Sequence, residues 1–252
     1  SEDYMAYQLW DTLQAFCSTI TGILATQEVL RGVGVGDDTA TPLAATITWV
    51  IKDGCGHIGR ILFTSTHSSH LDAYSKTWRW YADILNDMAM CLELNFSSVP
   101  GLTTPVLCCS TVMKAIVGVA GGSTRMAMTQ HHATRGNLAD VAAKDAAQET
   151  TVNLVASLTA LLIITIFKCT WMLNVIFGLL IVLHVLFNYN AVRATCLNSL
   201  NEPRLIQFFF WMFCLNFGLN YDLNECTSRC LKVLFLDLSD VPRRPFSAGR
   251  NN

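Results

Sequence analysis

Apolar segments alternate with short polar breaks along this chain, and their spacing predicts helices. In residues 4–30 apolar side chains recur every three or four positions, which places them on one face of a helix. Residues 76–94 repeat this spacing with a distinct polar side. The breaks fall at 31–36, at 97–105 and at the polar stretch 66–75, which we expect to be a loop. No alternating strands flank an Asn-Gly or Asp-Gly turn, so the sequence predicts an all-α fold.

The most apolar part of the chain is the tract 152–187, where Lys168 is the one charged side chain. A single helix of this length would measure about 54 Å, whereas the hydrocarbon of a membrane is about 30 Å thick. A break near Lys168 would make two shorter spans, with Trp171 at the membrane surface. The alternative is a core hairpin of a large soluble helical protein, but the tract lacks the polar face of such helices. We therefore predict a multi-helix membrane-associated bundle, in contact with membrane lipid, with a helical hairpin at 152–187.

Composition supports lipid as part of the solvent and excludes other classes. Hydrophobic residues make up 52% of the chain and charged residues 14%, whereas soluble domains are about one quarter charged. A net charge of −2 without a basic patch argues against nucleic acid as a partner. The cysteines lie mostly inside apolar runs rather than in polar loops, so we expect reduced thiols rather than a disulfide scaffold.

The apolar residues 43–63 are interrupted by an ionisable stripe. If this segment is helical, Asp53, His57 and Arg60 occupy positions i, i+4 and i+7 on one face. Ionisable side chains in an apolar helix are costly unless they are paired or face water. The stripe therefore indicates either a polar path that contacts a substrate or a structural Asp–Arg pair that locks two helices, and the sequence leaves both open.

The helix predicted at 76–94 carries a second charged face. Arg79 and Asp83 can pair at i, i+4, whereas Asp83 and Asp87 repel each other at the same spacing. This repulsion predicts a cationic partner from elsewhere, unless the segment is an ordinary amphipathic surface helix. The candidates for that partner are Arg60, Lys114 and Arg125.

Residues 123–150 form the most polar stretch. Asn137 is expected to cap a helix whose first turn contains Asp140, and Asp140 is expected to pair with Lys144. The other candidate polar residues of the stretch are Arg125, His131 and Arg135.

The sequence predicts neither a metal site nor a catalytic site. His131 and His132 are adjacent and should point in different directions on a helix, and the spacing of His67 and His70 lacks a third ligand. None of the common hydrolase or metalloprotease motifs occurs. We therefore expect no cofactor, no metal and no enzymatic activity.

Short sequence blocks in a fixed order carry a family resemblance. They include Gly32-Val-Gly-Val-Gly-Asp37, Thr48-Trp-Val-Ile-Lys-Asp-Gly54, Gly59-Arg-Ile-Leu-Phe63, Ala82-Asp-Ile-Leu-Asn-Asp87, Thr129-Gln-His131, Ala143-Lys-Asp145 and Gln148-Glu-Thr150. With these blocks the chain resembles the root UVB-sensitive (RUS) family, also described as the vitamin B6 photoprotection and homoeostasis domain. The resemblance covers 1–204, which we expect to be a helical membrane domain, and leaves 205–252 as a divergent tail.

The resemblance implies a membrane-associated protein without catalytic residues to carry over. Plant members of the family are linked to seedling development, UV-B response, auxin transport and vitamin B6 homeostasis, mostly in plastids. The function we expect is transporter-like, in vitamin B6 or small-metabolite homeostasis. One alternative is a membrane scaffold that binds a protein partner or a RUS relative through 76–94 and 123–150. The other is an enzyme acting on vitamin B6, for which the sequence offers no pyridoxal-phosphate signature.

Overall fold

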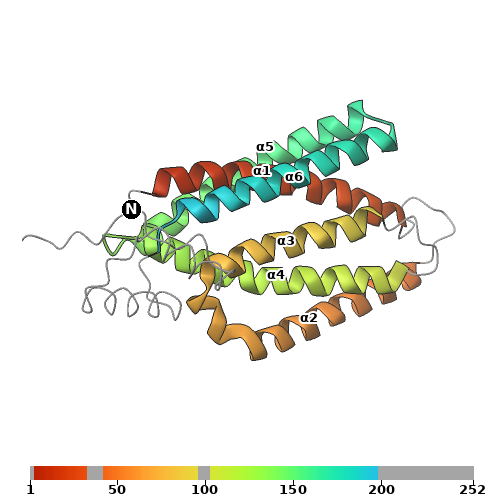
Figure 1. Cartoon of the computed structure of the whole chain (residues 1–252). Helices are drawn as coiled ribbons and strands as arrows, with labels where there is room; N and C mark the ends of the chain where they lie inside the picture. Colours follow the sequence, from red (N-terminus) through yellow and green to blue (C-terminus); the bar gives the residue numbers. More distant parts are fainter. Residues whose placement is uncertain (1–2, 33–41, 96–102, 198–252) are drawn as a thin grey trace, which may run out of the picture.

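Helices make up nearly all of residues 3–32, 42–95 and 103–197, the part of the chain that this computed structural model describes (Figure 1). No strand occurs among these residues, which confirms the predicted all-α fold. The predicted tail over 205–252 lies outside them. The helices are α1 (Tyr4–Gly32), α2 (Pro42–Ala73), α3 (Ser75–Leu94), α4 (Thr103–His132), α5 (Leu138–Ile166) and α6 (Thr170–Ala194).

The helices form two groups that pack side by side (Figure 1). One group consists of α1, α5 and α6, and the other of α2, α3 and α4. Contacts of α1 with α3, and smaller ones of α6 with α3 and of α5 with α4, join the two groups. The junction between them therefore lies along α1 and α3, and this is where the charged side chains of the bundle meet.

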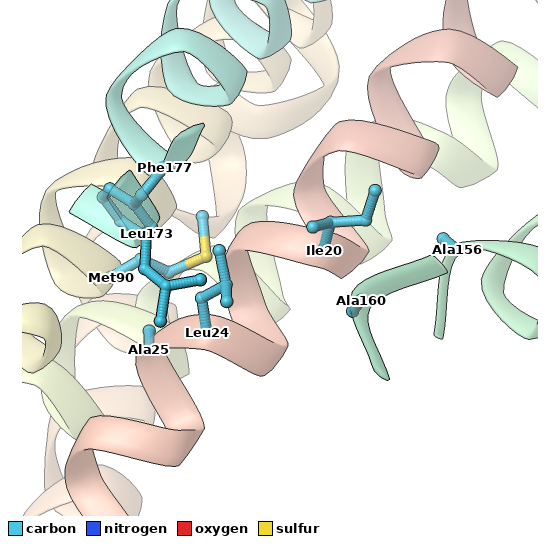
Figure 2. Packing of buried hydrophobic residues seen from close by; sticks show 8 residues of the cluster. All are labelled: Ile20, Leu24, Ala25, Met90, Ala156, Ala160, Leu173 and Phe177. Carbon is cyan, nitrogen blue, oxygen red and sulfur yellow. The ribbon is translucent and has the colours of Figure 1, made fainter. Parts of the chain in front are cut away.

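Apolar side chains from four helices form the main core beside this junction (Figure 2). Ile20, Leu24 and Ala25 lie on one face of α1 because they follow the helical repeat. Ala156 and Ala160, one turn apart on α5, are fully buried, and their small side chains let α5 approach α1 closely. The remaining members of this core are Met90, Leu173 and Phe177.

The predicted helical hairpin is confirmed, and so is its break near Lys168. α5 ends at Ile166 and α6 begins at Thr170. Between them Phe167 has extended backbone angles (φ −94°, ψ 92°). Lys168 and Trp171 are exposed at this turn, as expected for side chains at a membrane surface.

The two helices of the hairpin are longer than the apolar tract 152–187. α5 begins at Leu138 and α6 continues to Ala194. With 29 and 25 residues, they measure about 44 and 38 Å, so each helix extends beyond its half of the tract. The polar residues before the tract belong to the same helix because their side chains find partners on α1 and α4, as described below.

The loop predicted at 66–75 is also wrong, because α2 continues through most of it. The Thr66 hydroxyl donates a hydrogen bond of 2.8 Å to the Leu62 carbonyl oxygen, so this polar side chain is satisfied within the helix. The His67 ring stacks on Phe63, with ring centroids 5.0 Å apart. Serine, threonine and histidine side chains are therefore compatible with helix here, despite their preference for loops.

The polar stretch 123–150 is divided between two helices. Its first part completes α4, and a turn with Gly136 in the left-handed region (φ 67°) leads into α5. Asn137 lies at the predicted cap position, but its side chain makes no capping hydrogen bond; its Oδ1 accepts one from the Arg135 amide instead. Asp140 lies in the first turn of α5, as predicted.

Within residues 3–32, 42–95 and 103–197, three helices are long and apolar enough to cross a membrane. They are Thr104–His132, Leu138–Ile166 and Thr170–Ala194, with mean hydropathies of 1.6, 1.7 and 2.2 in their most apolar windows. Most residues of these windows are not buried within the bundle. Large apolar side chains instead cover the outer faces of α5 and α6, including Leu154, Leu158, Leu161, Val175, Leu179, Val182 and Leu186.

The cysteines behave as the composition predicts. Cys17, Cys55, Cys91, Cys108, Cys109, Cys169 and Cys196, those in the described part of the chain, are all free thiols. None of them forms a disulfide with another described residue.

Candidate functional site

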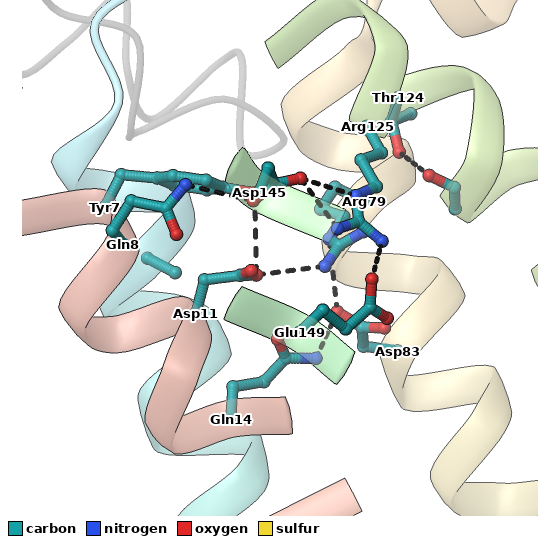
Figure 3. Close-up of polar contacts among 12 residues, drawn as sticks. Tyr7, Gln8, Asp11, Gln14, Arg79, Asp83, Thr124, Arg125, Asp145 and Glu149 are labelled. Atoms are coloured by element: carbon teal, nitrogen blue, oxygen red, sulfur yellow. Dashed lines mark hydrogen bonds and ion pairs between the residues drawn. The ribbon is translucent and has the colours of Figure 1, made fainter. Parts of the chain in front are cut away.

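A cluster of charged side chains lies inside the bundle where α1, α3, α4 and α5 meet (Figure 3). Its members come from four different helices, so the cluster forms when the helices pack. We call it the central polar cluster and define it by Asp11, Arg79, Asp83, Arg125, Asp145 and Glu149.

Arg79 holds two helices together at the centre of this cluster. Its Nη2 donates to Asp11 Oδ1 of α1 at 3.1 Å, and its Nε lies 3.5 Å from Asp83 Oδ2 on its own helix. The second contact confirms the predicted Arg79–Asp83 pair. Only 14% of the Arg79 side chain is exposed, so a guanidinium with this little water depends on its carboxylates.

Asp11 is the carboxylate most affected by this environment. Burial raises its pKa above the ordinary value of 3.8, although the nearby Arg79 opposes the rise. The Tyr7 hydroxyl lies 3.5 Å from its Oδ1. Asp11 is therefore a buried acid whose charge depends on the guanidinium across the helix interface.

Arg125 is the second cation of the cluster and joins α4 to α5. Its Nε and Nη2 lie 2.9 and 2.7 Å from Asp145 Oδ2, and its Nη1 donates to Glu149. Asp145 also accepts a hydrogen bond of 3.0 Å from Gln8 Nε2 on α1. The acids one turn apart on α5 therefore share one guanidinium, which brings the polar start of α5 into the bundle.

A chain of hydrogen bonds leads from this cluster to a fully buried histidine. Gln14 Nε2 lies 3.2 Å from Asp83 Oδ2 and 3.1 Å from His184 Nε2. On the other side of the imidazole, His184 Nδ1 lies 2.8 Å from Asp87 Oδ2. A neutral His184 that donates from Nδ1 to Asp87 and accepts from Gln14 at Nε2 satisfies both contacts.

His184 is a residue that the sequence pattern did not single out. It lies in the apolar tract 152–187, in which the one charged side chain is Lys168. The available signal was the pairing of His184 with Asn188 one turn later, because two polar residues on one face of an apolar helix indicate a buried partner.

Lys114 has a different partner from the one predicted. Its Nζ lies 2.6 Å from Glu93 Oε2, and Glu93 also accepts a hydrogen bond of 2.5 Å from the Ser110 hydroxyl. Because Asp83 pairs with Arg79, and Asp87 with His184, the predicted partnership of these acids with Arg60, Lys114 or Arg125 is wrong. Helical spacing correctly predicted the charged face of 76–94, but the partners of these charges depend on tertiary packing.

The stripe on α2 lies away from the central polar cluster. Asp53, His57 and Arg60 are exposed, and Asp53 Oδ1 pairs with Lys52 Nζ of its own helix at 3.0 Å. Arg60 extends over α4, where its Nη2 would lie 3.8 Å from a Cβ atom added to Gly118. The structure therefore does not join this stripe to the other candidate residues.

The last candidates lie near the turn between α4 and α5. Asp140 and Lys144 pair at 2.9 Å with both side chains more than half exposed, which confirms the pairing and makes it a weak surface contact. Arg135 is exposed in the turn. His131 Nε2 instead lies 2.9 Å from Asp3 Oδ2.

A small crevice opens beside the central polar cluster between α1 and α5. Carboxylate, amide and hydroxyl groups surround it, and Gln148 Nε2 donates to Thr12 Oγ1 across it at 2.5 Å. The crevice has room for about one water molecule on the acidic side of the cluster. Its walls are Gln8, Asp11, Thr12, Ala15, Asp145, Gln148, Glu149 and Val152.

In the part of the chain that the structure describes, these features define a class of protein: a helical bundle with paired charges inside and three helices apolar enough to cross a membrane. Residues 1–213 match the family described as the vitamin B6 photo-protection and homoeostasis domain. The chain belongs to this family, the root UVB sensitive (RUS) family, as its sequence blocks indicated.

Curated relatives come from a slime mould and a plant. "RUS family member 1" of Dictyostelium discoideum is 47% identical over 211 residues, which are 80% of this chain and 39% of that protein. "Protein root UVB sensitive 3" of Arabidopsis thaliana is 39% identical over 203 residues, 80% of this chain and 46% of the relative. "Protein root UVB sensitive 2, chloroplastic" of the same plant is 32% identical over 207 residues, 81% of this chain and 47% of the relative.

The chain spans less than half the length of these relatives. Their names state no catalytic activity. No solved structure matches the chain.

Proposed function

We propose that the chain is the core of a non-enzymatic, transporter-like membrane protein that takes part in vitamin B6 or small-metabolite homeostasis. The observation that carries this proposal is the contrast between the outside and the inside of the bundle. The outer faces of α5 and α6 are apolar, whereas Arg79 and Arg125 pair inside the bundle with three carboxylates. A fourth carboxylate, that of Glu149, pairs with Arg125 at the partly exposed edge. Ionisable side chains in the interior of a membrane bundle mark paths for substrates or ions.

The balance of charge supports a ligand with a basic nitrogen. Asp11, Asp83, Asp145 and Glu149 surround the two guanidinium groups of the central polar cluster, so negative charge is in excess. A protonated nitrogen next to the crevice would compensate this excess. The pyridine ring of the vitamin B6 compounds carries such a nitrogen, which fits the description of the family.

Uptake into proteoliposomes tests this proposal. The full chain is reconstituted, and the uptake of labelled pyridoxine is compared between wild type, Asp11→Asn and Asp140→Asn. We expect Asp11→Asn to lose roughly tenfold or more in uptake, the effect of about 1.4 kcal/mol, because Asp11 lines the crevice. Asp140→Asn, an exposed acid on the surface, should transport like wild type. Wild-type protein that is folded by its elution profile yet moves neither pyridoxine nor other vitamin B6 compounds contradicts the proposal.

Membership of the family also supports a role in UV-B- and auxin-related development. The protein would act in a membrane, and the plastid is the organelle of many plant relatives. Expression in an Arabidopsis line that lacks "root UVB sensitive 3" tests this role. Restored root growth under UV-B supports it. Full expression without any restoration argues against it.

A second candidate function is a membrane scaffold that binds a protein partner or a RUS relative, and the stripe on α2 favours it. Arg79, Asp83 and Asp87 face the interior, so the predicted docking face at 76–94 is not a free surface. Asp53, His57 and Arg60, in contrast, are exposed in the apolar segment 43–63 of α2, and charges that faced lipid there would be costly. Another polypeptide that covered this stripe would remove the cost.

Cross-linking through the stripe separates the scaffold from the transporter. With a photoactivatable cross-linker coupled to the thiol of His57→Cys, a membrane-embedded scaffold should give covalently linked complexes. Thr150→Cys, an exposed position on α5, serves as the matched control. A clean monomer with His57→Cys in native membranes rules the scaffold out.

A further inference from the structure

Three side chains with metal-binding atoms meet at one end of the bundle. Asp3 precedes α1, and His131 and His132 complete α4. The start of α1, the end of α4 and the end of α6 all lie at this end (Figure 1). The carboxylate and the two imidazoles each offer one ligand atom, and these atoms lie within 4.8 Å of one another.

The distances suit a transition-metal ion. His131 Nε2 lies 2.9 Å from Asp3 Oδ2, and His132 Nδ1 lies 3.9 Å from Asp3 Oδ1. In a tetrahedral zinc site with bonds of about 2.0 to 2.2 Å, neighbouring ligand atoms are about 3.3 Å apart. The two separations lie on either side of this value, so small side-chain rotations bring both imidazoles and the carboxylate onto one ion.

The expectation that adjacent imidazoles point apart is wrong here. The centroids of the His131 and His132 rings are 5.1 Å apart. They reach one carboxylate because His131 presents its distal Nε2 while His132 presents its proximal Nδ1. The rings of Tyr4 and Tyr7 pack against His132 at centroid distances of 5.3 and 5.1 Å, which fixes the orientation of this ligand before an ion arrives.

The surroundings resemble those of metal sites in proteins. The exposed fractions of the His131, His132 and Asp3 side chains are only 10%, 2% and 14%. The Cys196 amide after α6 donates a hydrogen bond of 2.8 Å to Asp3 Oδ2, which orients the carboxylate as outer-shell contacts do in metal sites.

We propose that Asp3, His131 and His132 bind one divalent transition-metal ion, with zinc as the best match for two imidazoles and a carboxylate. Binding requires that His131 Nε2 and His132 Nδ1 carry no proton, because a metal ligand atom must be deprotonated. A water molecule completes the coordination. The ion fastens the start of α1 to the end of α4 and, through the Cys196 amide, to the segment after α6, so its role is to stabilise this end of the bundle. The proposal does not depend on transport.

Zinc titration of the purified full chain in detergent tests the site. The protein is freed of metal with a chelator, and zinc alone is added. Titration calorimetry measures the heat of zinc binding, and thermal denaturation measures the melting temperature. We expect one zinc ion per chain and a higher melting temperature with zinc. His131→Gln, with its weakly metal-binding amide, should lose at least about tenfold in affinity, a change of 1.4 kcal/mol, together with the zinc-dependent rise in melting temperature.

Matched controls and a direct view of the ligands complete the test. His67→Gln and His70→Gln remove two exposed imidazoles from α2 and should leave zinc binding unchanged. X-ray absorption of the zinc-loaded protein should show nitrogen and oxygen ligands at about 2.0 to 2.1 Å. Because His132 is buried, Asp3→Asn serves as the second variant if His132→Gln does not fold. Wild-type affinity in both His131→Gln and Asp3→Asn, a metal shell of sulfur alone, or no zinc binding overturns the proposal.

Discussion

Asp87 of α3 and His184 of α6 form a buried pair, with Oδ2 and Nδ1 2.8 Å apart and 6% and 0% of the side chains exposed. They lie 97 positions apart in the sequence, yet each is the other's main polar contact. Asp87 Oδ1 has no hydrogen-bond partner among the described residues. The carboxylate therefore depends on His184, and the pair holds α6 against α3 beside the central polar cluster.

We predict that His184→Leu destabilises the protein by about 3–5 kcal/mol, because it leaves the Asp87 carboxylate buried without its partner. His184→Leu combined with Asp87→Leu should recover a large part of this loss, since no unpaired charge remains. Denaturation of the purified variants in detergent measures both effects. Equal loss in the single and the double variant would show that the pair is not coupled.

Arg79 gives a second prediction, because its guanidinium joins Asp11 to Asp83. Arg79→Gln leaves two carboxylates of the central polar cluster without their cation, so we expect a loss of about 3–5 kcal/mol in stability. Lys144→Gln breaks an exposed pair with Asp140 and should change stability by less than about 1 kcal/mol. Chemical denaturation of the two variants compares them directly, and similar losses would contradict the interior position of Arg79.

Close packing of α2 on α4 predicts opposite effects at two glycines. A methyl group at Gly56 would lie 2.8 Å from Thr111 Cγ2, whereas nothing lies within 4 Å of the same position at Gly54. Gly54→Ala should therefore gain up to about 1 kcal/mol from helix propensity. Gly56→Ala should lose about 1–3 kcal/mol from overpacking. Melting temperatures of the two variants give the test, and a Gly56→Ala protein as stable as Gly54→Ala would disprove the close contact.

The buried carboxyl of Asp11 predicts a specific pH dependence. Burial raises its pKa above 3.8, so the folded protein holds this proton more tightly than the unfolded chain. Its contribution to stability is complete below pH 3.8 and is lost as the pH rises through the raised value. Because an amide does not titrate, Asp11→Asn should show a smaller fall in melting temperature over this range than wild type.

Melting curves recorded upward from about pH 4 measure the difference between these slopes. Asp140→Asn, a change at an exposed carboxylate, should keep the wild-type slope. If Asp11→Asn follows the wild-type slope as well, Asp11 does not titrate as its burial implies.

The elements that sequence periodicity predicted best are those decided by local length and polarity. The break near Lys168 followed from the length of 152–187 against the thickness of a membrane, and the structure has it between Ile166 and Thr170. The pairs Arg79–Asp83 and Asp140–Lys144 followed from helical spacing alone. Such features need no knowledge of the tertiary fold.

The features that sequence reasoning missed are one local continuation of a helix and several contacts that depend on packing between distant helices. The loop expected at 66–75 is helical because side chains such as Thr66 bond to the backbone of the preceding turn. Lys114 pairs with Glu93, and Asp87 with His184, because α4 and α6 each pack against α3. Spacing along one helix cannot identify a partner on another, so the charged faces were predictable and their contacts were not.

The proposed insertion of the α5–α6 hairpin into a membrane is tested most directly by carbonate extraction combined with labelling of Cys169, an exposed thiol in the turn between α5 and α6. The protein should stay with the membranes, and a membrane-impermeant maleimide should label Cys169 from one side only. Leu161→Cys and Leu179→Cys, on the outer faces of the two helices, should react only after detergent is added. Release of the protein by carbonate, with both introduced thiols labelled in the absence of detergent, would contradict the account.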